Sequence, residues 1–326
     1  MVIFTLLVLS GLYGAWWMTM ARAFDAEIVN WAKARQAEGW TVNLDRRQTG
    51  GSPFTLKIKI IDPAMKYGAW SWQGKQLDLS LDLLSPEQFK VDFFGQQSGQ
   101  VVINGKVEAF TLVADNMKAR ADFGRGMVLR TALTADGLTA HLKNRQQKYT
   151  FAELNLRVDQ KARRLTEWGL RLRDLRLPET LHAPLGRRFQ RLNAKGQFYG
   201  VVRGQNLNHA LSAWRDGGGK LNVTALDVAY LPLQVTGGGG VTLDANLQPM
   251  GGFDLQARGG AETIDVLVNV GMIKGLQSVA AKLMLATLTK TPEGGGETYL
   301  DVSLTLQDQI LSAGPYKILR LRPIIW

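Results

Sequence analysis

The sequence predicts a mainly β protein with a few helices: an N-terminal transmembrane helix, then an elongated antiparallel β-sheet with one long helix of the C-terminal half packed on it. Three observations predict this fold. Residues 2–20 are an uncharged apolar run. Most later segments alternate apolar and polar side chains with a period of two, which is typical of half-buried strands. Turn dipeptides such as Asp136-Gly137 and Asp216-Gly217 indicate hairpins, arranged as a meander, a groove or a half-barrel.

The first 23 residues predict a transmembrane anchor. A helix rises about 1.5 Å per residue, so roughly 20 apolar residues cross a hydrocarbon core of about 30 Å. Trp16 and Trp17 suit the interfacial belt at one end of such a span. A cleaved signal peptide is one alternative, because Ala21-Arg22-Ala23 has the small-x-small form of a cleavage site. A buried core helix is the other. The run lacks a basic leader, which an anchor and a signal peptide would ordinarily have.

The helical period continues beyond the apolar run and then changes to that of strands. Residues 24–40 place Phe24, Ile28 and Trp31 on one side of an amphipathic helix, which Gly39 ends. Residues 54–60 and 77–83 alternate strictly and open the sheet. The other predicted strands are 89–94, 100–104, 106–113, 127–133, 138–142, 149–158, 168–177, 191–202, 221–230, 232–236, 241–247, 252–258 and 299–306.

Two interior helices and two β modules are predicted. A short helix is expected near 207–215, and a longer one over 262–289, where apolar residues return every three or four positions. A proline-rich stretch around 178–184 predicts a boundary between a first module at 41–180 and a second at 181–326. The glycine run 237–240 resembles a phosphate cradle only superficially, because a strand pattern follows it, so a flexible hairpin is expected.

The sequence carries no signal for catalysis, a metal or a cofactor. The chain has no cysteine, which excludes disulfides and thiol chemistry. His141, His182 and His209 are isolated, without a second ligand at helical spacing that would make a metal site. The strand carboxylates are expected in a water-facing row rather than in an acid–base pair. These carboxylates are Asp78, Asp82, Asp92, Glu108 and Asp301. We therefore expect no enzymatic activity.

Basic side chains concentrate in the middle of the chain. The net charge is +11, and residues 157–191 hold ten Lys and Arg against four Asp and Glu. Guanidinium groups recognise phosphates well, so headgroup phosphates of lipid or lipopolysaccharide are one candidate partner. A solvated strand face is the plainer interpretation, and nucleic acid is the least favoured. The candidate headgroup contacts are Arg171, Arg173, Arg176, Arg187, Arg188 and Arg191.

The ratio of strands to helices raises a question about the apolar side of the sheet. A one-sided sheet has to cover its apolar face with helices, a second sheet or a ligand. Two interior helices are few for so many strands. Either the sheet closes on itself as a sandwich or half-barrel, or part of its apolar face stays open as a trough for acyl chains or a partner. Both outcomes stay open at this point.

Several short segments resemble a known family. They are Gly39-Trp40, the Gly-Ser-Pro-Phe-Thr-Leu of 51–56, the Gly-Val-Thr-Leu-Asp of 240–244, the Gly-Phe-Asp-Leu of 252–255, the Leu-Thr-Leu-Gln-Asp of 304–308 and the Ala-Gly-Pro of 313–315. Together and in this order they resemble domain of unknown function 2125, a family of membrane-anchored envelope proteins of Gram-negative bacteria. The chain is more distantly similar to AsmA-type envelope proteins. Ser52 departs from the family's usual aromatic residue.

The resemblance implies a location and brings no functional residue. It implies a single-pass protein of the bacterial inner membrane, held through Val2 to Met20, with its body in the periplasm, or a periplasmic protein after signal cleavage. The expected function is that of a non-enzymatic envelope protein which binds lipid or glycolipid through an apolar sheet face and the basic stretch. The alternative is a structural or assembly factor for another envelope protein. No cofactor is expected.

Overall fold

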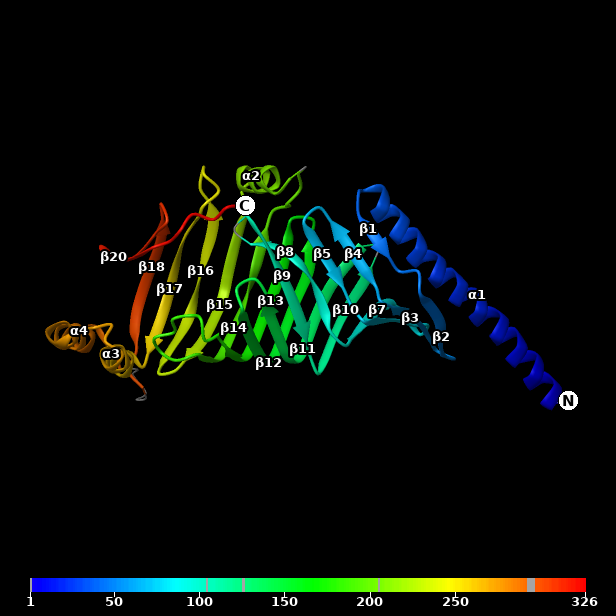
Figure 1. The fold of residues 1–326 in the computed structure, drawn as a ribbon, viewed down its shortest axis with the longest axis horizontal. Coiled ribbons are helices and arrows are strands. Elements are labelled where there is room, and N and C mark those ends of the chain that lie inside the picture. Colours follow the sequence, from blue (N-terminus) through cyan, green and yellow to red (C-terminus); the bar gives the residue numbers. More distant parts are fainter. Residues whose placement is uncertain (1, 104, 125–126, 205, 292–296) are drawn as a thin grey trace. The chain divides into compact units, whose positions relative to one another are not determined.

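The computed structural model describes residues 2–103, 105–124, 127–204, 206–291 and 297–326 (Figure 1). These residues form twenty strands, paired antiparallel, and four helices, so the prediction of a mainly β protein with few helices is confirmed. Contacts divide the chain into two units. Unit 1 comprises residues 1–135 and 140–145, and unit 2 comprises residues 136–139 and 146–326.

Unit 1 begins with one continuous helix, α1 (Val2–Ala37), whose second half is the helix predicted at 24–40. Among the residues that the structure describes, no helix is long and apolar enough to cross a membrane. This finding corrects the transmembrane anchor predicted for residues 1–23. The helix continues without a break past the charged residues Arg22 and Asp25. Trp17 donates a hydrogen bond from Nε1 to the Ser52 carbonyl at 3.2 Å. Its aromatic side chains thus contact the protein's own strands.

The strands of unit 1 form two antiparallel ladders. The first pairs β2 (Arg47–Ser52), β3 (Thr55–Ile61), β6 (Gln76–Asp82), β7 (Ser85–Phe94) and β10 (Asn116–Gly124) in that order. The second pairs β1 (Thr41–Asn43), β4 (Ala64–Tyr67), β5 (Trp70–Gln73), β8 (Gln97–Ile103) and β9 (Lys106–Val113), and β11 (Met127–Leu142) pairs with β9.

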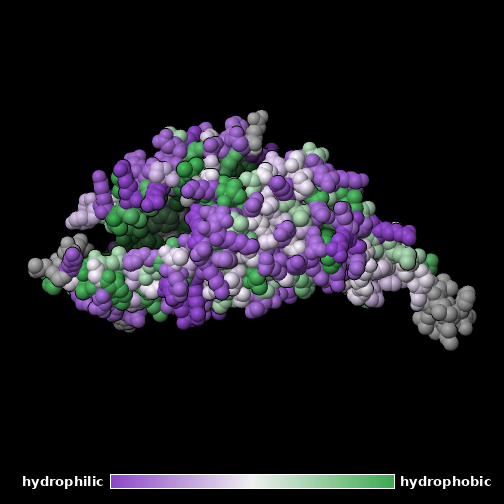
Figure 2. All heavy atoms as spheres, in the orientation of Figure 1, coloured by the Kyte–Doolittle hydropathy of each residue, from purple (hydrophilic) through white to green (hydrophobic). Residues whose placement is uncertain are grey.

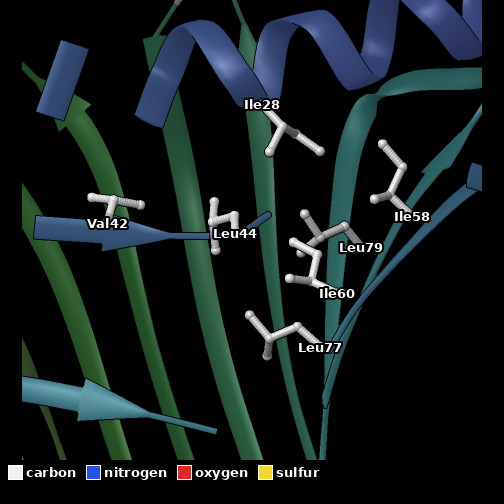
Figure 3. Packing of buried hydrophobic residues seen from close by; sticks show 7 residues of the cluster. All are labelled: Ile28, Val42, Leu44, Ile58, Ile60, Leu77 and Leu79. Carbon is white, nitrogen blue, oxygen red and sulfur yellow. The ribbon is translucent and has the colours of Figure 1, made fainter. Parts of the chain in front are cut away.

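A closed hydrophobic core lies between these ladders and α1. Ile28 comes from α1, Val42 from the second ladder, and Ile58 and Ile60 from the first (Figure 3). Ile58 and Ile60 are 0% exposed, because strict alternation in β3 directs every second side chain to the same interior. Leu44, Leu77 and Leu79 complete the cluster.

The described residues of unit 2 form a nine-strand meander in which each strand pairs with the one before it. The strands are β12 (Gln147–Ala162), β13 (Leu165–Arg176), β14 (Arg188–Tyr199), β15 (Lys220–Tyr230), β16 (Leu233–Leu243), β17 (Pro249–Arg258), β18 (Leu300–Gln307), β19 (Ile310–Ala313) and β20 (Tyr316–Arg320). Residues 177–187 only connect β13 to β14, which pair along their length. The predicted boundary between modules at residues 180 and 181 falls within this connection and stays a prediction.

The helices of unit 2 lie between strands. Helix α2 (Leu207–Asp216) follows β14, whereas α3 (Gly260–Asn269) and α4 (Gly275–Leu288) follow β17. The single helix predicted over 262–289 is therefore wrong. Gly271 has a φ of +76° and its N–H bonds to the Val268 carbonyl, while the N–H of Met272 bonds to Leu267. This pair of bonds is a Schellman motif, which ends a helix at a residue that adopts left-handed backbone.

Three further sequence predictions, all of hairpin turns at glycine residues, are wrong. The run 237–240 lies inside β16 and is not a hairpin. A Cβ on Gly239 would lie 2.2 Å from the Gly252 carbonyl oxygen, so the close approach of β17 requires a glycine there. Asp136-Gly137 lies inside β11, with Gly137 at a φ of +59°, and Asp216-Gly217 forms the C-terminal end of α2. Glycine marks close contacts and caps here as well as hairpin turns.

The expectation of a water-facing row of carboxylates is wrong for two residues. Asp78 and Glu108 are buried. Lys57 pairs with Asp78 at 2.6 Å, and Arg145 donates to Glu108 at 2.7 Å. These ion pairs compensate the burial of the carboxylates and belong to the packing of unit 1.

Candidate functional site

The sheet of unit 2 has one apolar and one polar face. Residues directly opposite each other in an antiparallel pair lie on the same face, so the register sorts the side chains. Leu156 pairs with Leu170, Leu172 with Leu192, and Val228 with Val235. We define the apolar face by Leu154, Leu156, Leu170, Leu172, Leu192, Ala194, Leu226, Val228, Val235, Phe253, Leu255, Val302 and Leu304, which this register links from β12 to β18.

The apolar face is only half-buried. None of the residues that define it is fully buried, and Leu156 is exposed. Gly237 and Gly239 occupy two positions of this face on β16, which therefore has no side chain there. Figure 2 shows a hollow lined by hydrophobic residues where Figure 1 places β15 to β18. The apolar side of unit 2 is thus an open surface with a concave part.

The helices of unit 2 lie near the ends of the strands (Figure 1). Trp214 of α2 stacks on Phe198 with ring centroids 5.2 Å apart and donates a hydrogen bond to the Tyr199 carbonyl. At the opposite ends, α3 and α4 border an open groove of about 930 Å³ together with Leu231, Ala257 and Leu300. Neither contact places a helix over the middle of the apolar face.

A basic groove of about 720 Å³ lies where β12, β13 and β14 meet the connection 177–187. Its charged lining is Lys148, Arg176, Glu179, Arg187 and Arg188. Arg187 pairs with Glu179 at 2.7 Å, and Arg188 pairs with Asp174 at 2.5 Å. The hydrogen bond from Arg187, and then its charge, lower the pKa of the exposed Glu179 carboxyl. Among the described interactions, Lys148 and Arg176 have no ion pair.

The basic groove borders the apolar face. Thr150, which lines the groove, pairs with Arg176, and Arg176 pairs with Arg188. Thr150 and Leu154 lie four positions apart on β12, as Arg176 and Leu172 do on β13, so the groove lies further along the strands that carry the apolar face. A molecule that lies along these strands could therefore extend from the apolar face to the groove.

The six arginines predicted as headgroup contacts fall into two groups. Arg176, Arg187 and Arg188 line the basic groove. Arg171, Arg173 and Arg191 share the polar face, because Arg171 pairs with Asn193 and Arg173 with Arg191.

Acidic neighbours compensate part of the positive charge of the arginines on the polar face. Arg173 lies 3.4 Å from Glu153, and Arg191 lies 2.8 Å from Asp227, which also accepts from Asn193. The hydrogen bond to Asp227 raises the pKa of Arg191. The polar face is thus a network of ion pairs on the side of the sheet away from the apolar face.

Sequence reasoning missed Lys148 and Thr150 as part of the groove. Their alternation with Tyr149 and Phe151 was visible, but only the pairing of β12 with β13 brings them beside Arg176. As to metals, the described residues contain no cluster of three or more His, Asp and Glu side chains that could hold an ion.

Comparison with known proteins identifies the family of the chain. A family model described as an uncharacterized protein conserved in bacteria (DUF2125) matches residues 17–322. This match confirms the resemblance to domain of unknown function 2125. A comparison with curated proteins finds no match.

Proposed function

This chain belongs to the DUF2125 family of bacterial proteins, and we propose that it binds an amphiphile, a lipid or glycolipid with an anionic headgroup, on unit 2. The observation that carries the proposal is the open apolar face that ends in a basic groove. The acyl chains lie along the apolar face, and the headgroup enters the groove. The role is binding without catalysis.

The apolar face supplies the driving force. Large exposed apolar patches on soluble units mark binding surfaces, because covering each Å² of apolar surface contributes about 25 cal/mol. An acyl chain gains about 0.8 kcal/mol for every methylene that it buries. A flexible chain also fits a face built from Leu and Val side chains, which offers no fixed polar groups and hence no demand for a particular shape.

The groove supplies the selectivity for anions. Lys148 and Arg176 keep their charges available, whereas Glu179 and Asp174 compensate Arg187 and Arg188. Guanidinium groups bind phosphate through paired N–H donors. The location of the protein in the periplasm, where such lipids would meet it, stays a prediction.

The test compares neighbouring residues that lie on opposite faces of β16. Val235 belongs to the apolar face, and Thr236 pairs with Asp227 on the polar face. We expect lipid extraction and mass spectrometry of the purified full chain to find bound amphiphile. V235K should lower the amount of lipid per protein several-fold, because it places a charge among the chains. T236K should leave that amount unchanged. Absence of lipid from the wild-type chain, or equal losses in both variants, would contradict the proposal.

A second candidate function is that of an assembly factor, favoured by the edge strand β20. Within the described residues β20 pairs only with β19, and Tyr316, Ile318 and Leu319 are exposed. An uncovered edge can accept a strand of another protein. Under this alternative, Ile318→Pro abolishes co-purification of a partner protein while V235K leaves it intact. The reverse pattern supports amphiphile binding.

A further inference from the structure

A second basic hollow lies beside α2 in unit 2, and we call it the α2 hollow. Its volume is about 510 Å³. Arg163 and Arg164 line it from the turn between β12 and β13, and Arg203 lines it from the connection between β14 and α2. Ala213 and Trp214 of α2 form a further wall. Three arginines from two separate loops therefore border one hollow.

The α2 hollow and the basic groove lie at opposite ends of β13 and β14. Leu165 pairs with Tyr199 at the end near α2, and Arg176 pairs with Arg188 at the end near the groove. β13 has 12 residues. Because a strand rises about 3.3 Å per residue, its two ends are roughly 35 Å apart. One headgroup cannot occupy both places, so the α2 hollow is a separate site.

The wall formed by α2 is fixed through Trp214, which is 6% exposed. A Cβ on Gly200 would lie 2.7 Å from Cδ1 of Trp214, and a Cβ on Gly219 would lie 2.3 Å from its Cδ2. These two glycines therefore let the strand ends close on the indole ring. The N–H of Gly200 donates to the Arg164 carbonyl at 2.9 Å, which joins the two loops that carry the arginines. Ordering this backbone thus adds little to the cost of binding a ligand.

Among the described residues, no carboxylate lines the α2 hollow. The carboxylates on the adjoining elements pair with other cations. Asp216 of α2 pairs with Arg215 at 2.8 Å, and Glu167 of β13 pairs with Lys161 at 3.3 Å. The buried Asp159 of β12 pairs with Arg157 at 2.7 Å. The charge of the arginines in the hollow is therefore not compensated by these acids.

The three arginines differ in what they contact. Arg164 donates a hydrogen bond from Nη2 to the carbonyl of Gly217, the C-terminal cap of α2. A cation suits the C-terminal end of a helix, so Arg164 has a structural role there. Arg163 and Arg203 are exposed, and their side chains have neither an ion pair nor a hydrogen bond among the described interactions. The packing of the chain thus does not account for these two residues.

The chemistry of the α2 hollow fits an oxyanion. Cations that border one hollow repel one another, and a bound anion removes that repulsion. Guanidinium groups bind phosphate oxygens through paired N–H donors. A volume of about 510 Å³ lies within the range of about 300–1,000 Å³ that is typical of small-molecule sites, so an organic group fits beside a phosphate. Val201 and Ala213 offer that group apolar contacts.

We propose that the α2 hollow binds the phosphate group of a phosphate monoester. Arg163 and Arg203 are its charged ligands, and Arg164 contributes the N–H groups that Gly217 leaves free. The ester is either a small soluble molecule or the headgroup of a lipid, because both present the same phosphate to the arginines.

The experiment follows each arginine separately in the full chain. Phenylglyoxal modifies accessible guanidinium groups, and mass spectrometry of peptides measures the rate of modification at each position. The soluble probe is glycerol 3-phosphate, with sodium chloride at equal ionic strength as its control. The lipid probe is vesicles of phosphatidylcholine with phosphatidic acid, with vesicles of phosphatidylcholine alone as the control. Arg171 is the matched reporter, because it is exposed on β13 and has no ion pair among the described interactions.

We expect at least one probe to slow the modification of Arg163 and Arg203 by about fivefold or more, because bound phosphate occupies their N–H groups. The rate at Arg171 should stay unchanged. R203Q should raise the probe concentration for half-protection of Arg163 about tenfold, since one of two charged ligands is lost. R171Q should leave it unchanged, and circular dichroism checks that both variants are folded. Protection of Arg176 reports the basic groove, so this proposal and the amphiphile site succeed or fail separately.

The two probes distinguish the sources of the phosphate. Protection by glycerol 3-phosphate supports a soluble ester, and protection by the phosphatidic acid vesicles alone supports a lipid headgroup. The proposal is overturned if neither probe protects Arg163 and Arg203, or if the matching control protects them equally. Equal protection of Arg171 would also refute it, as would unchanged protection of Arg163 in R203Q.

Discussion

Units 1 and 2 are built from the same kind of alternating antiparallel strand, and they differ in what faces the apolar side. In unit 1 two ladders and α1 enclose Ile58 and Ile60 completely. In unit 2 the strands follow one meander, and the corresponding side chains, such as Leu226 and Val235, stay half-buried. Alternation alone therefore does not make a core. A closed core also needs a second layer over the apolar side. Within the described residues no second layer covers the middle of unit 2's apolar face, which is therefore a surface available for binding.

The largest contrast should appear on truncating one apolar residue in each unit. Ile58→Ala creates a cavity in a closed core and should lower the free energy of unfolding by about 2–5 kcal/mol. Leu226→Ala should cost about 1 kcal/mol or less, because its side chain already contacts solvent. Urea unfolding followed by circular dichroism measures both. Equal losses would mean that the apolar face of unit 2 is as well packed as the core of unit 1.

Glycine substitution sharpens the comparison at the level of the backbone. Gly239→Ala places a Cβ 2.2 Å from the Gly252 carbonyl oxygen and should destabilise the protein by about 1–3 kcal/mol through forced backbone shifts. Gly50→Ala is the control, because a Cβ at Gly50 of β2 meets nothing within 4 Å. Thermal unfolding should show a lower midpoint for the first variant and an unchanged or slightly higher one for the second.

The basic groove and the polar face of unit 2 should differ in their response to charge reversal. Arg176 and Arg171 lie on the same strand, both are exposed, and neither has an ion pair among the described interactions. R176E should weaken binding of anionic lipid about tenfold, since hydrogen bonds to charged groups contribute about 1.5–3 kcal/mol. R171E, on the polar face, should leave binding unchanged. Titration with fluorescent anionic lipid measures both, and an equal effect would assign the headgroup to neither face.

The sequence could predict what depends on local periodicity. The alternating runs 54–60 and 77–83 correspond to β3 and β6, because a period of two fixes strand and face together. It could not assign Arg176 to the groove and Arg171 to the polar face, since that required the register of β12, β13 and β14. Glycine misled the prediction for the same reason. The need for glycine in the run 237–240 becomes clear only from the close approach of β17.

The smallest effect is expected from removing an ion pair of the basic groove, which tests whether that pair reduces the positive charge of the groove. E179Q removes the carboxylate that pairs with Arg187 at 2.7 Å and should strengthen anionic lipid binding about twofold at neutral pH, because exposed ion pairs contribute little. The pKa of Glu179 is lowered by Arg187, so the pair persists at neutral pH and is lost only as the pH falls through that lowered pKa, below the ordinary value of 4.5.

The pH dependence of the difference between wild type and E179Q therefore has a definite sign. As Glu179 takes up a proton, Arg187 is released and the wild-type groove gains positive charge, so wild-type affinity should approach that of E179Q from below. The matched control is E167Q. Glu167 pairs with Lys161 at 3.3 Å and does not line the groove. If E167Q strengthens lipid binding as much as E179Q does, general charge and not the groove attracts the headgroup. The selectivity of unit 2 would then lie in its apolar face alone.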